Sequence, residues 1–254
     1  MTTQIVILAA GMGSRLGRSL PKPLTQLSDG RSIGTRAVIL AMGVEYRQLP
    51  AEGCADLTGA GVYYGATTSV ASDCENDEVY VIGGANSAGQ AAMYLARTAK
   101  SVTIVSRRTL EDSMSHYLIQ QIRAQDNIKE MPHTVVHAVK GDGHLESICL
   151  ENTQSGEREE FHCGRMFIFI GAEPRTDWLD GVVVRDDHGF VVAGPDLRDV
   201  TGWTLDRPPH HLESSVPGVF VAGDVRADSA KRVAAAVGEG SMAVMLVHRY
   251  LAET

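Results

Sequence analysis

The sequence has few cysteines and no apolar run long enough for a membrane span. Its four cysteines, Cys54, Cys74, Cys149 and Cys163, lie far apart, with neither a C-x-x-C pair nor zinc-type spacing. We therefore predict reduced, packed thiols and no metal site. The longest apolar runs, such as GVFVAG and RMFIFIG, have only the length of a strand. No basic region precedes the first apolar run, so we expect no signal peptide, no membrane partner and a cytoplasmic location.

Positive charge is also scarce. The chain carries 23 Lys and Arg against 31 Asp and Glu, a formal net charge of -8. Nucleic acids and anionic membranes attract basic surfaces, so the sequence argues against both as partners. The hydrophobic fraction of 44% and the charged fraction of 21% are typical of a globular domain. We interpret the negative charge as a contribution to solubility.

Glycine, by contrast, is plentiful, and it commonly follows apolar runs of strand length. Six strands are predicted, at residues 4–11, 36–43, 78–84, 101–108, 165–171 and 218–224. Helical spacing is found at residues 86–100, 113–125 and 231–253, and residues 133–163 alternate in polarity as in a β-meander. This order predicts an α/β fold with two Rossmann-like units.

The segment VYVIGGANSAGQAA, residues 79–92, is the strongest dinucleotide-binding pattern. It matches G-x-G-x-x-G/A with Ala85 at the second position and Ala88 at the third. Small residues there let backbone N–H groups and the helix N-terminus approach a pyrophosphate. The predicted contact residues are Gly83, Gly84, Ala85, Asn86, Ser87 and Ala88.

The end of the next strand predicts which nicotinamide cofactor this loop takes. Ser106, Arg107 and Arg108 stand about 20 residues after the glycines, where the ribose-reading residue belongs. An acidic residue at this place would bind the 2′-hydroxyl of NADH, whereas two guanidinium groups and a hydroxyl favour the 2′-phosphate of NADPH. The alternative is that Arg107 and Arg108 are only a solvated strand end.

A second strand end, GVFVAGDV at residues 218–225, precedes the C-terminal helix. Asp224 would be a hydrogen-bond acceptor for sugar or ribitol hydroxyls, and the helix N-terminus can face an electron-rich ring. An ordinary strand, turn and helix would give the same pattern.

Together these segments resemble a known family. RAVILAMGVEYRQL, VYVIGGANSAGQAAMYLA, VTIVSRRTLEDSMSHYL, FIFIGAEPRTDWL and PGVFVAGDVRADSAKRVAAAVGEGSMAV occur in the order and spacing of the thioredoxin reductase-like, FAD- and NADPH-dependent pyridine nucleotide-disulfide oxidoreductases. The resemblance implies a truncated FAD domain, residues 34–64 and 172–254, with an NADPH domain, residues 65–171, inserted into it. It also implies that Gly171 lies at the NADPH, and that Gly43, Gly223, Asp224, Arg232 and Val233 lie at the FAD.

The chain departs from that family at the redox site. Where disulfide-reducing members have Cys-Ala-Thr-Cys, this sequence has Gly65-Ala66-Thr67-Thr68. Neither end of this tetrapeptide can form a disulfide, so the resemblance implies an NADPH-dependent flavin oxidoreductase without a dithiol relay. We therefore assign no catalytic side chain. The expected electron acceptor is a small or quinone-like molecule, and a homodimer is left open.

The second departure is the N-terminus, where the family's FAD fingerprint is missing. LAAGMGSRLGRSLPKPL, residues 8–24, instead resembles the signature of nucleotidyltransferases, and this resemblance covers residues 1–33. It implies phosphate contacts by Gly11, Gly13, Arg15 and Lys22. Three alternatives follow: this stretch supplies the central strand of the flavin domain and FAD is bound weakly, the chain is a nucleotidyltransferase, or it is a non-catalytic nucleotide-binding remnant.

Overall fold

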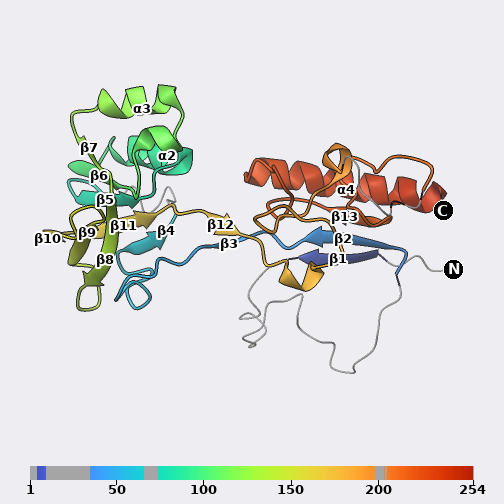
Figure 1. Ribbon diagram of the computed structural model, residues 1–254, viewed down its shortest axis with the longest axis horizontal. Coiled ribbons are helices and arrows are strands. Elements are labelled where there is room, and N and C mark those ends of the chain that lie inside the picture. The colour runs from blue at the N-terminus through green and yellow to red at the C-terminus, as the bar shows by residue number, and fades with distance from the viewer. Residues whose placement is uncertain (1–4, 10–34, 66–73, 198–202, 204, 254) are drawn as a thin grey trace. The chain divides into compact units, whose positions relative to one another are not determined.

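The computed structural model describes residues 5–9, 35–65, 74–197, 203 and 205–253. These residues form two compact units, which are described one at a time (Figure 1). Unit 1 contains residues 1–45 and 172–254, and unit 2 contains residues 46–171. Gly11, Gly13, Arg15 and Lys22 lie outside the described residues, so their predicted phosphate contacts stay predictions.

Unit 2 is built on a parallel sheet. Its five strands, in spatial order, are β4 (Val62–Tyr64), β11 (Arg165–Ile168), β5 (Glu78–Ile82), β6 (Ser101–Val105) and β7 (Ile128–Met131). Helix α2 (Asn86–Leu95) joins β5 to β6, and η3 (Leu110–Asp112) and α3 (His116–Arg123) follow β6. This is the strand, helix and strand arrangement that the glycine pattern predicts.

Alternation along β5 explains why both faces of this sheet are covered. Val79 and Val81 belong to a buried cluster with Ala88, Ala92 and Leu95 of α2. Tyr80 and Ile82 point to the opposite face and pack with buried side chains of the β-meander. Successive side chains of a strand point to opposite faces, so a strand that is apolar at every position needs a layer on each side.

The predicted β-meander is the second layer of unit 2. Strands β8 (Thr134–Lys140), β9 (Ser147–Asn152) and β10 (Arg158–His162) form an antiparallel sheet, with a register shift between Val136 and Ala138. Its inward side chains include Val136, Ile148 and Leu150, which are buried against the parallel sheet.

Unit 1 has a smaller parallel sheet. Strand β2 (Ala37–Ala41) lies between β1 (Ile5–Ala9) and β13 (Val219–Val221), and it is parallel to both. Helix α4 (Val233–Glu253) covers one face, where Ile39 and Phe220 pack against Ala243 and Val247. The other face packs on residues 179–193, which begin at the last residue of η4 (Asp177–Leu179) and end before η5 (Gly194–Asp196).

The position of β1 corrects one expectation. The N-terminal stretch does supply a strand of unit 1, with Ile5 opposite Ala37 and Ala9 opposite Ala41. However, β1 lies at the edge of the described sheet, and β2 is its central strand. The reason is that β13 pairs with the other side of β2.

The boundary between the units also differs from the sequence-based division. Sequence analysis placed residues 46–64 with the FAD domain, but these residues make their contacts in unit 2. β4 pairs with β11, and Cys54, Leu57 and Val62 are buried in the core of unit 2. The chain crosses the boundary at β3 (Glu45–Tyr46) and β12 (Ala172–Glu173), which form a two-stranded sheet.

The four cysteines are all free thiols, as predicted. Cys54, Cys74 and Cys163 are buried, and Cys149 is partly exposed. Burial raises the pKa of Cys54 to about 11 and that of Cys163 to about 12. Among the described residues, no helix is both long enough and apolar enough to cross a membrane.

Candidate nucleotide and flavin sites

The loop after β5 needs glycine because backbone passes close to it. Gly83 has a φ of +141°, and a Cβ on this residue would lie 2.4 Å from the carbonyl oxygen of Phe169. Its N–H donates to the carbonyl oxygen of Val105 at 2.9 Å, which fixes the loop to the end of β6. A Cβ on Gly84 would lie 3.2 Å from the Cβ of Ser106. The loop is therefore a narrow backbone turn at the carboxyl ends of β5 and β6.

Helix α2 begins directly after this loop, and no side chain caps its N-terminus. The N-cap is Ala85, which makes no side-chain capping bond, and no acidic residue lies in the first turn. Asn86 and Ser87 are exposed, while Ala88 is completely buried against the sheet. The first N–H groups of a helix need an acceptor from outside the helix, so this end of α2 favours an anion.

Contacts with the start of α3 hold the loop in place. Asn86 accepts hydrogen bonds at its Oδ1 from the N–H and the hydroxyl of Ser115, at 2.8 and 2.9 Å. The hydroxyl of Ser113 donates to the carbonyl oxygen of Gly84 at 2.9 Å. These bonds fix the entry into α2 without using its free N–H groups.

The end of β6 carries two cations without partners. Arg107 and Arg108 are exposed, and neither guanidinium group makes a hydrogen bond or an ion pair with another described residue. Ser106 is buried, and its hydroxyl donates to the carbonyl oxygen of Arg108 at 2.7 Å. Ser106 therefore shapes the strand end, and the two guanidinium groups are left to meet a ligand.

The acidic residues that follow these cations most closely in the sequence do not pair with them. Glu111 pairs with Arg123 at 2.8 Å, and the Oδ2 of Asp112 accepts a hydrogen bond from the Thr109 hydroxyl at 3.0 Å. Hydrogen bonds from its own backbone N–H and from Arg123 hold the pKa of Glu111 below its usual range.

Gly171, the last residue predicted to lie at the NADPH, comes two residues after Phe169. It has a φ of +94° and lies where the chain leaves unit 2.

Unit 1 brings two of its strand ends to one edge. Val221 of β13 pairs with Leu40 of β2, so Gly43 and Gly223 both follow the carboxyl ends of neighbouring strands. Gly223 has a φ of +79°, and Asp224 beside it is partly buried. The carboxylate of Asp224 accepts no hydrogen bond from the part of the chain that the structure describes.

The connection from Asp224 to α4 contains a second polar atom without a partner. The hydroxyl of Ser229 is buried and makes no hydrogen bond among the described residues. Arg232 and Val233 follow at the start of α4, and both are exposed, Val233 by 83%. A buried hydroxyl without a partner costs free energy, so its presence in the segment that follows Asp224 is consistent with a polar ligand there.

Comparison with known proteins places this chain in a family. A model of the pyridine nucleotide-disulphide oxidoreductases matches residues 15–240. The chain belongs to the pyridine nucleotide-disulphide oxidoreductase family. The match confirms the resemblance seen in the sequence. It begins within residues 1–33, and the comparisons give no support to the nucleotidyltransferase resemblance of that stretch.

The similar proteins within this family are thioredoxin reductases. The enzyme of Bacillus subtilis is 34% identical over 221 residues, which cover 86% of this chain and 64% of the relative. The enzyme of Peptoclostridium acidaminophilum is 32% identical over 232 residues, which cover 85% of this chain and 65% of the relative. This member of the oxidoreductase family therefore spans about two thirds of the length of the curated relatives it matches.

A solved structure confirms the α/β fold. The thioredoxin reductase of Lactococcus lactis, in its FR conformation, superposes with a TM-score of 0.68 at 28% identity. The superposition covers 87% of this chain and 67% of that structure.

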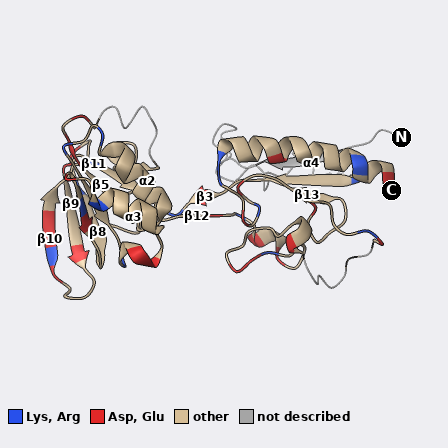
Figure 2. Cartoon of the chain, turned by 90° about the horizontal axis from the view of Figure 1, so that it is seen from above, with Lys and Arg blue, Asp and Glu red and all other residues tan. Residues whose placement is uncertain are grey.

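One ion pair in this chain was not anticipated from the sequence. Glu239, on the second turn of α4, pairs with Arg226 at 2.6 Å, and both side chains are only 15% exposed. Partial burial alone would raise the pKa of Glu239. Hydrogen bonds from Arg226 and from the N–H of Gly223 outweigh burial and hold that pKa below its usual range. α4 is uncharged along most of its length (Figure 2), so an acidic residue inside its VAAAVGEGSMAV segment was the available signal.

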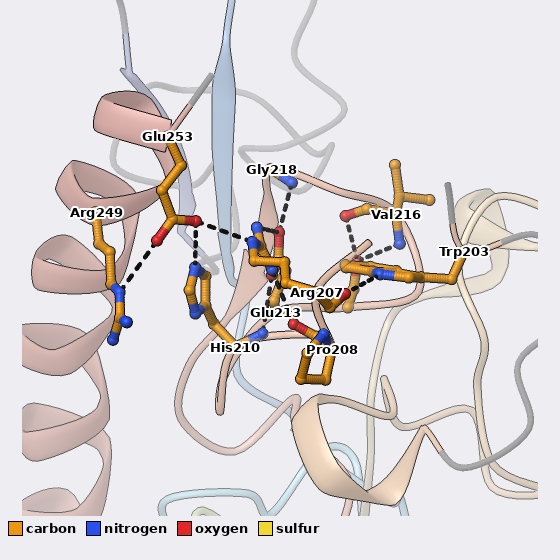
Figure 3. A network of polar contacts seen from close by, with 10 residues as sticks. Trp203, Arg207, Pro208, His210, Glu213, Val216, Gly218, Arg249 and Glu253 are labelled. Atoms are coloured by element: carbon orange, nitrogen blue, oxygen red, sulfur yellow. Dashed lines mark hydrogen bonds and ion pairs between the residues drawn. The ribbon is translucent and has the colours of Figure 1, made fainter. Parts of the chain in front are cut away.

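A second unanticipated network fixes the start of β13 (Figure 3). The carboxylate of Glu213 is fully buried and accepts two hydrogen bonds from Arg207, at 2.7 and 3.1 Å. It also accepts the N–H groups of His210 and Gly218, both at 2.9 Å. Arg207 reaches Glu253 as well, at 2.9 Å, so the network joins the loop before β13 to the end of α4.

These donors also explain the charge of the buried carboxylate. Burial raises the pKa of Glu213, but the hydrogen bonds from Arg207, Gly218 and His210 together lower it below the usual value. The carboxylate therefore stays charged in the interior of unit 1. Arg207 and Glu213 stand six positions apart in a loop, and no local sequence motif predicts that they pair.

The position of the family's dithiol is described only at its first residue. Gly65 has a φ of +86°, and a Cβ there would come no closer than 3.9 Å, to the hydroxyl of Tyr46. Ala66, Thr67 and Thr68 lie outside the described residues, so the loss of the dithiol rests on the sequence. Within the described residues, no group of three His, Cys, Asp or Glu side chains has the arrangement of a metal site.

Proposed function

We propose that this chain is an NADPH-dependent flavin oxidoreductase that lacks the dithiol of its thioredoxin reductase relatives. The observation that carries the proposal is the pair Arg107 and Arg108, exposed and without partners at the end of β6 beside an uncapped helix N-terminus. NADPH presents one anionic group for each of these features, because its pyrophosphate suits the helix N-terminus and its 2′-phosphate suits the arginines.

The residues of unit 2 fit NADPH. The narrow turn at Gly83 and Gly84 leaves no room for a side chain, so the backbone itself forms the surface that a pyrophosphate would approach. In this role the N–H groups from Gly84 to Ala88 would bind the pyrophosphate, and Gly83 would shape the turn that presents them. Asn86 fixes the loop through Ser115. Arg107 and Arg108 would bind the 2′-phosphate, and Ser106 would hold their backbone in position.

The residues of unit 1 fit one part of FAD. Asp224 would accept hydrogen bonds from ribitol hydroxyls, and the Ser229 hydroxyl is a buried polar group that still needs a partner. Arg232 and Val233, exposed at the start of α4, would lie against the flavin ring, and Gly43 shares the sheet edge with Gly223. The sequence lacks the family's N-terminal fingerprint for the adenosine diphosphate, so we expect weak binding and substoichiometric FAD.

The proposed chemistry requires no protein thiol. When both cofactors are bound, NADPH supplies a hydride and the flavin accepts it. The chain's own part is to bind and orient the two cofactors. Because Gly65 and Thr68 stand in the positions of the relatives' cysteines, this site offers no thiol pair as an electron acceptor. Dioxygen or a quinone-like molecule would then be the acceptor. A homodimer remains a prediction, which light scattering of the purified protein can check.

The test is a titration of the purified chain with FAD, followed by anaerobic addition of NADPH. We expect FAD to bind reversibly, and NADPH to bleach the absorbance of the bound flavin without any thiol reagent. A protein that binds NADPH but never FAD would instead support the non-catalytic remnant. NTP-dependent release of pyrophosphate with Mg²⁺ would support the nucleotidyltransferase, although no described residue favours that reaction.

A further inference from the structure

One carboxylate of α4 holds both ends of the turn that follows β13. The N–H of Gly223 donates to the Oε2 of Glu239 at 2.7 Å. Arg226 donates to the Oε1 through its Nε at 3.1 Å and through its Nη2 at 2.6 Å. The N–H of Arg226 also donates to the carbonyl oxygen of Gly223 at 3.0 Å, which closes a four-residue turn. Glu239 therefore contacts the first and the last residue of this turn.

The rest of the turn is fixed differently. Val225 is completely buried, and its carbonyl oxygen accepts the N–H of Val191 at 3.0 Å. Ala227 in turn donates its N–H to the carbonyl oxygen of Val191 at 2.9 Å. The carboxyl side of the turn is thus paired with neighbouring backbone, whereas Gly223 has no side chain to anchor it. Glu239 supplies the charged acceptor on that side.

We propose that Glu239 is a positioning residue, which fixes the turn from Gly223 to Arg226 and thereby orients Asp224. Asp224 is the second residue of the turn, and its carboxylate has no partner of its own among the described residues. Its direction is set by the backbone of the turn alone. The inference rests on the proposed role of Asp224 in FAD binding, and it assigns to Glu239 and Arg226 a role in that affinity without contact with the cofactor.

Hydrogen exchange of the full chain without FAD tests the structural half. Glu239→Gln keeps an oxygen for the Gly223 N–H but removes the charge that Arg226 pairs with, and Glu239→Ala removes both. We expect the amides of residues 223–227 to exchange about tenfold faster in Glu239→Gln, as for the loss of one charge-assisted hydrogen bond. In Glu239→Ala the increase should be larger.

Glu213→Gln is the matched control, because it makes the same chemical change in the same unit at a more deeply buried carboxylate. It should speed exchange at residues 210–218 and leave residues 223–227 unchanged. Unchanged exchange at residues 223–227 in Glu239→Ala would overturn the proposal. Equal acceleration throughout unit 1 by both Glu→Gln variants would also overturn it, because it would indicate general destabilisation.

FAD titrations of the same proteins test the functional half. We expect Glu239→Gln to raise the Kd for FAD about tenfold, and Glu213→Gln to change it less than about twofold. Arg226→Gln should weaken FAD binding as well, and the two losses should be non-additive because they remove one interaction. Equal weakening by Glu239→Gln and Glu213→Gln would overturn the role of Glu239. If the wild-type chain binds no FAD, the proposed function fails, while the exchange data still decide whether Glu239 fixes the turn.

Discussion

Unit 2 and unit 1 both place a glycine turn and a helix after a buried parallel strand, yet they differ in how much of a binding site each provides. Unit 2 holds its loop, its helix N-terminus and its two cations within one strand, helix and strand segment, residues 78–108. Unit 1 provides a strand end and a helix start from residues 219–233. In the sequence, its β1 is followed by residues that lack the family's FAD fingerprint. A site encoded by contiguous residues depends on one segment alone, whereas a site gathered from distant segments depends on each of them.

The largest effect is expected at the narrow turn that follows β5 in unit 2. Gly83→Ala would place a Cβ 2.4 Å from the carbonyl oxygen of Phe169, at a φ of +141°. We expect a loss of about 2–6 kcal/mol in the free energy of unfolding of unit 2, from backbone strain and overpacking together. Urea unfolding of the wild type and the variant, with loss of NADPH binding as the signal, measures this difference in free energy.

Gly156→Ala is the control for that substitution. Gly156 has a φ of +76° with no atom within 4 Å of an added Cβ, so only strain of about 1–2 kcal/mol is expected. Equal losses at both glycines would mean that contact with Phe169 contributes nothing.

The next effect concerns cofactor choice. Changing both Arg107 and Arg108 to Ala should weaken NADPH binding by about 1.5–3 kcal/mol for each lost charged hydrogen bond, and leave NADH nearly unchanged. Calorimetric titration with both cofactors measures this. Lys100→Ala removes the same charge from the same unit near the N-terminal end of β6, and it should change neither affinity. Similar losses for NADPH and NADH would refute the assignment of the 2′-phosphate.

A smaller effect is expected from acid at two carboxylates of unit 1. Glu213 and Glu239 have pKa values lowered in the folded chain, so their contribution to stability is complete above the pKa of an unfolded glutamate. It is lost as the pH falls through the lower, folded values. Glu213→Gln should make the stability of unit 1 less dependent on pH below about 4.3. A stability curve as steep as that of the wild type would contradict this.

No effect on thioredoxin reduction is expected from replacing Cys74, the thiol that follows the position of the relatives' dithiol in the sequence. Cys74 is buried and forms no disulfide. The chain should therefore fail to reduce thioredoxin in an NADPH-coupled assay, with or without Cys74→Ser, because a thiolate beside the flavin is required for that step. Thioredoxin reduction that disappears in Cys74→Ser would show that Cys74 works with another thiol.

The two units also show what the sequence could and could not predict. Strand β5, helix α2 and the exposed Arg107 and Arg108 followed from local patterns, since their contacts lie within a few dozen residues. The pair of Arg226 and Glu239 and the network around Glu213 did not, because each depends on how a loop folds back onto α4. The edge position of β1 depends on β13, more than 200 residues away, and no local pattern contains that information.

The sequence-based domain boundary at residue 64 also differs from the boundary between the units in the structure. Residues 46–64 follow an FAD-domain strand in the sequence, and their glycines and short apolar stretches give no periodicity that assigns them to either sheet. The pairing of β4 with β11, about 100 residues later, decides their place. Long-range strand pairing is a tertiary choice, so it was visible only in the structure.

The distribution of thiols gives the molecule a built-in reporter. All four cysteines lie in unit 2, and unit 1 has none. An alkylating dye applied to the native protein should modify Cys149 alone, because the other three side chains are buried. Burial also suppresses the thiolates of Cys54 and Cys163 by raising their pKa values. Any further labelling would report the opening of unit 2 alone. The opening kinetics of this unit can therefore be followed through its native cysteines, without an engineered labelling site.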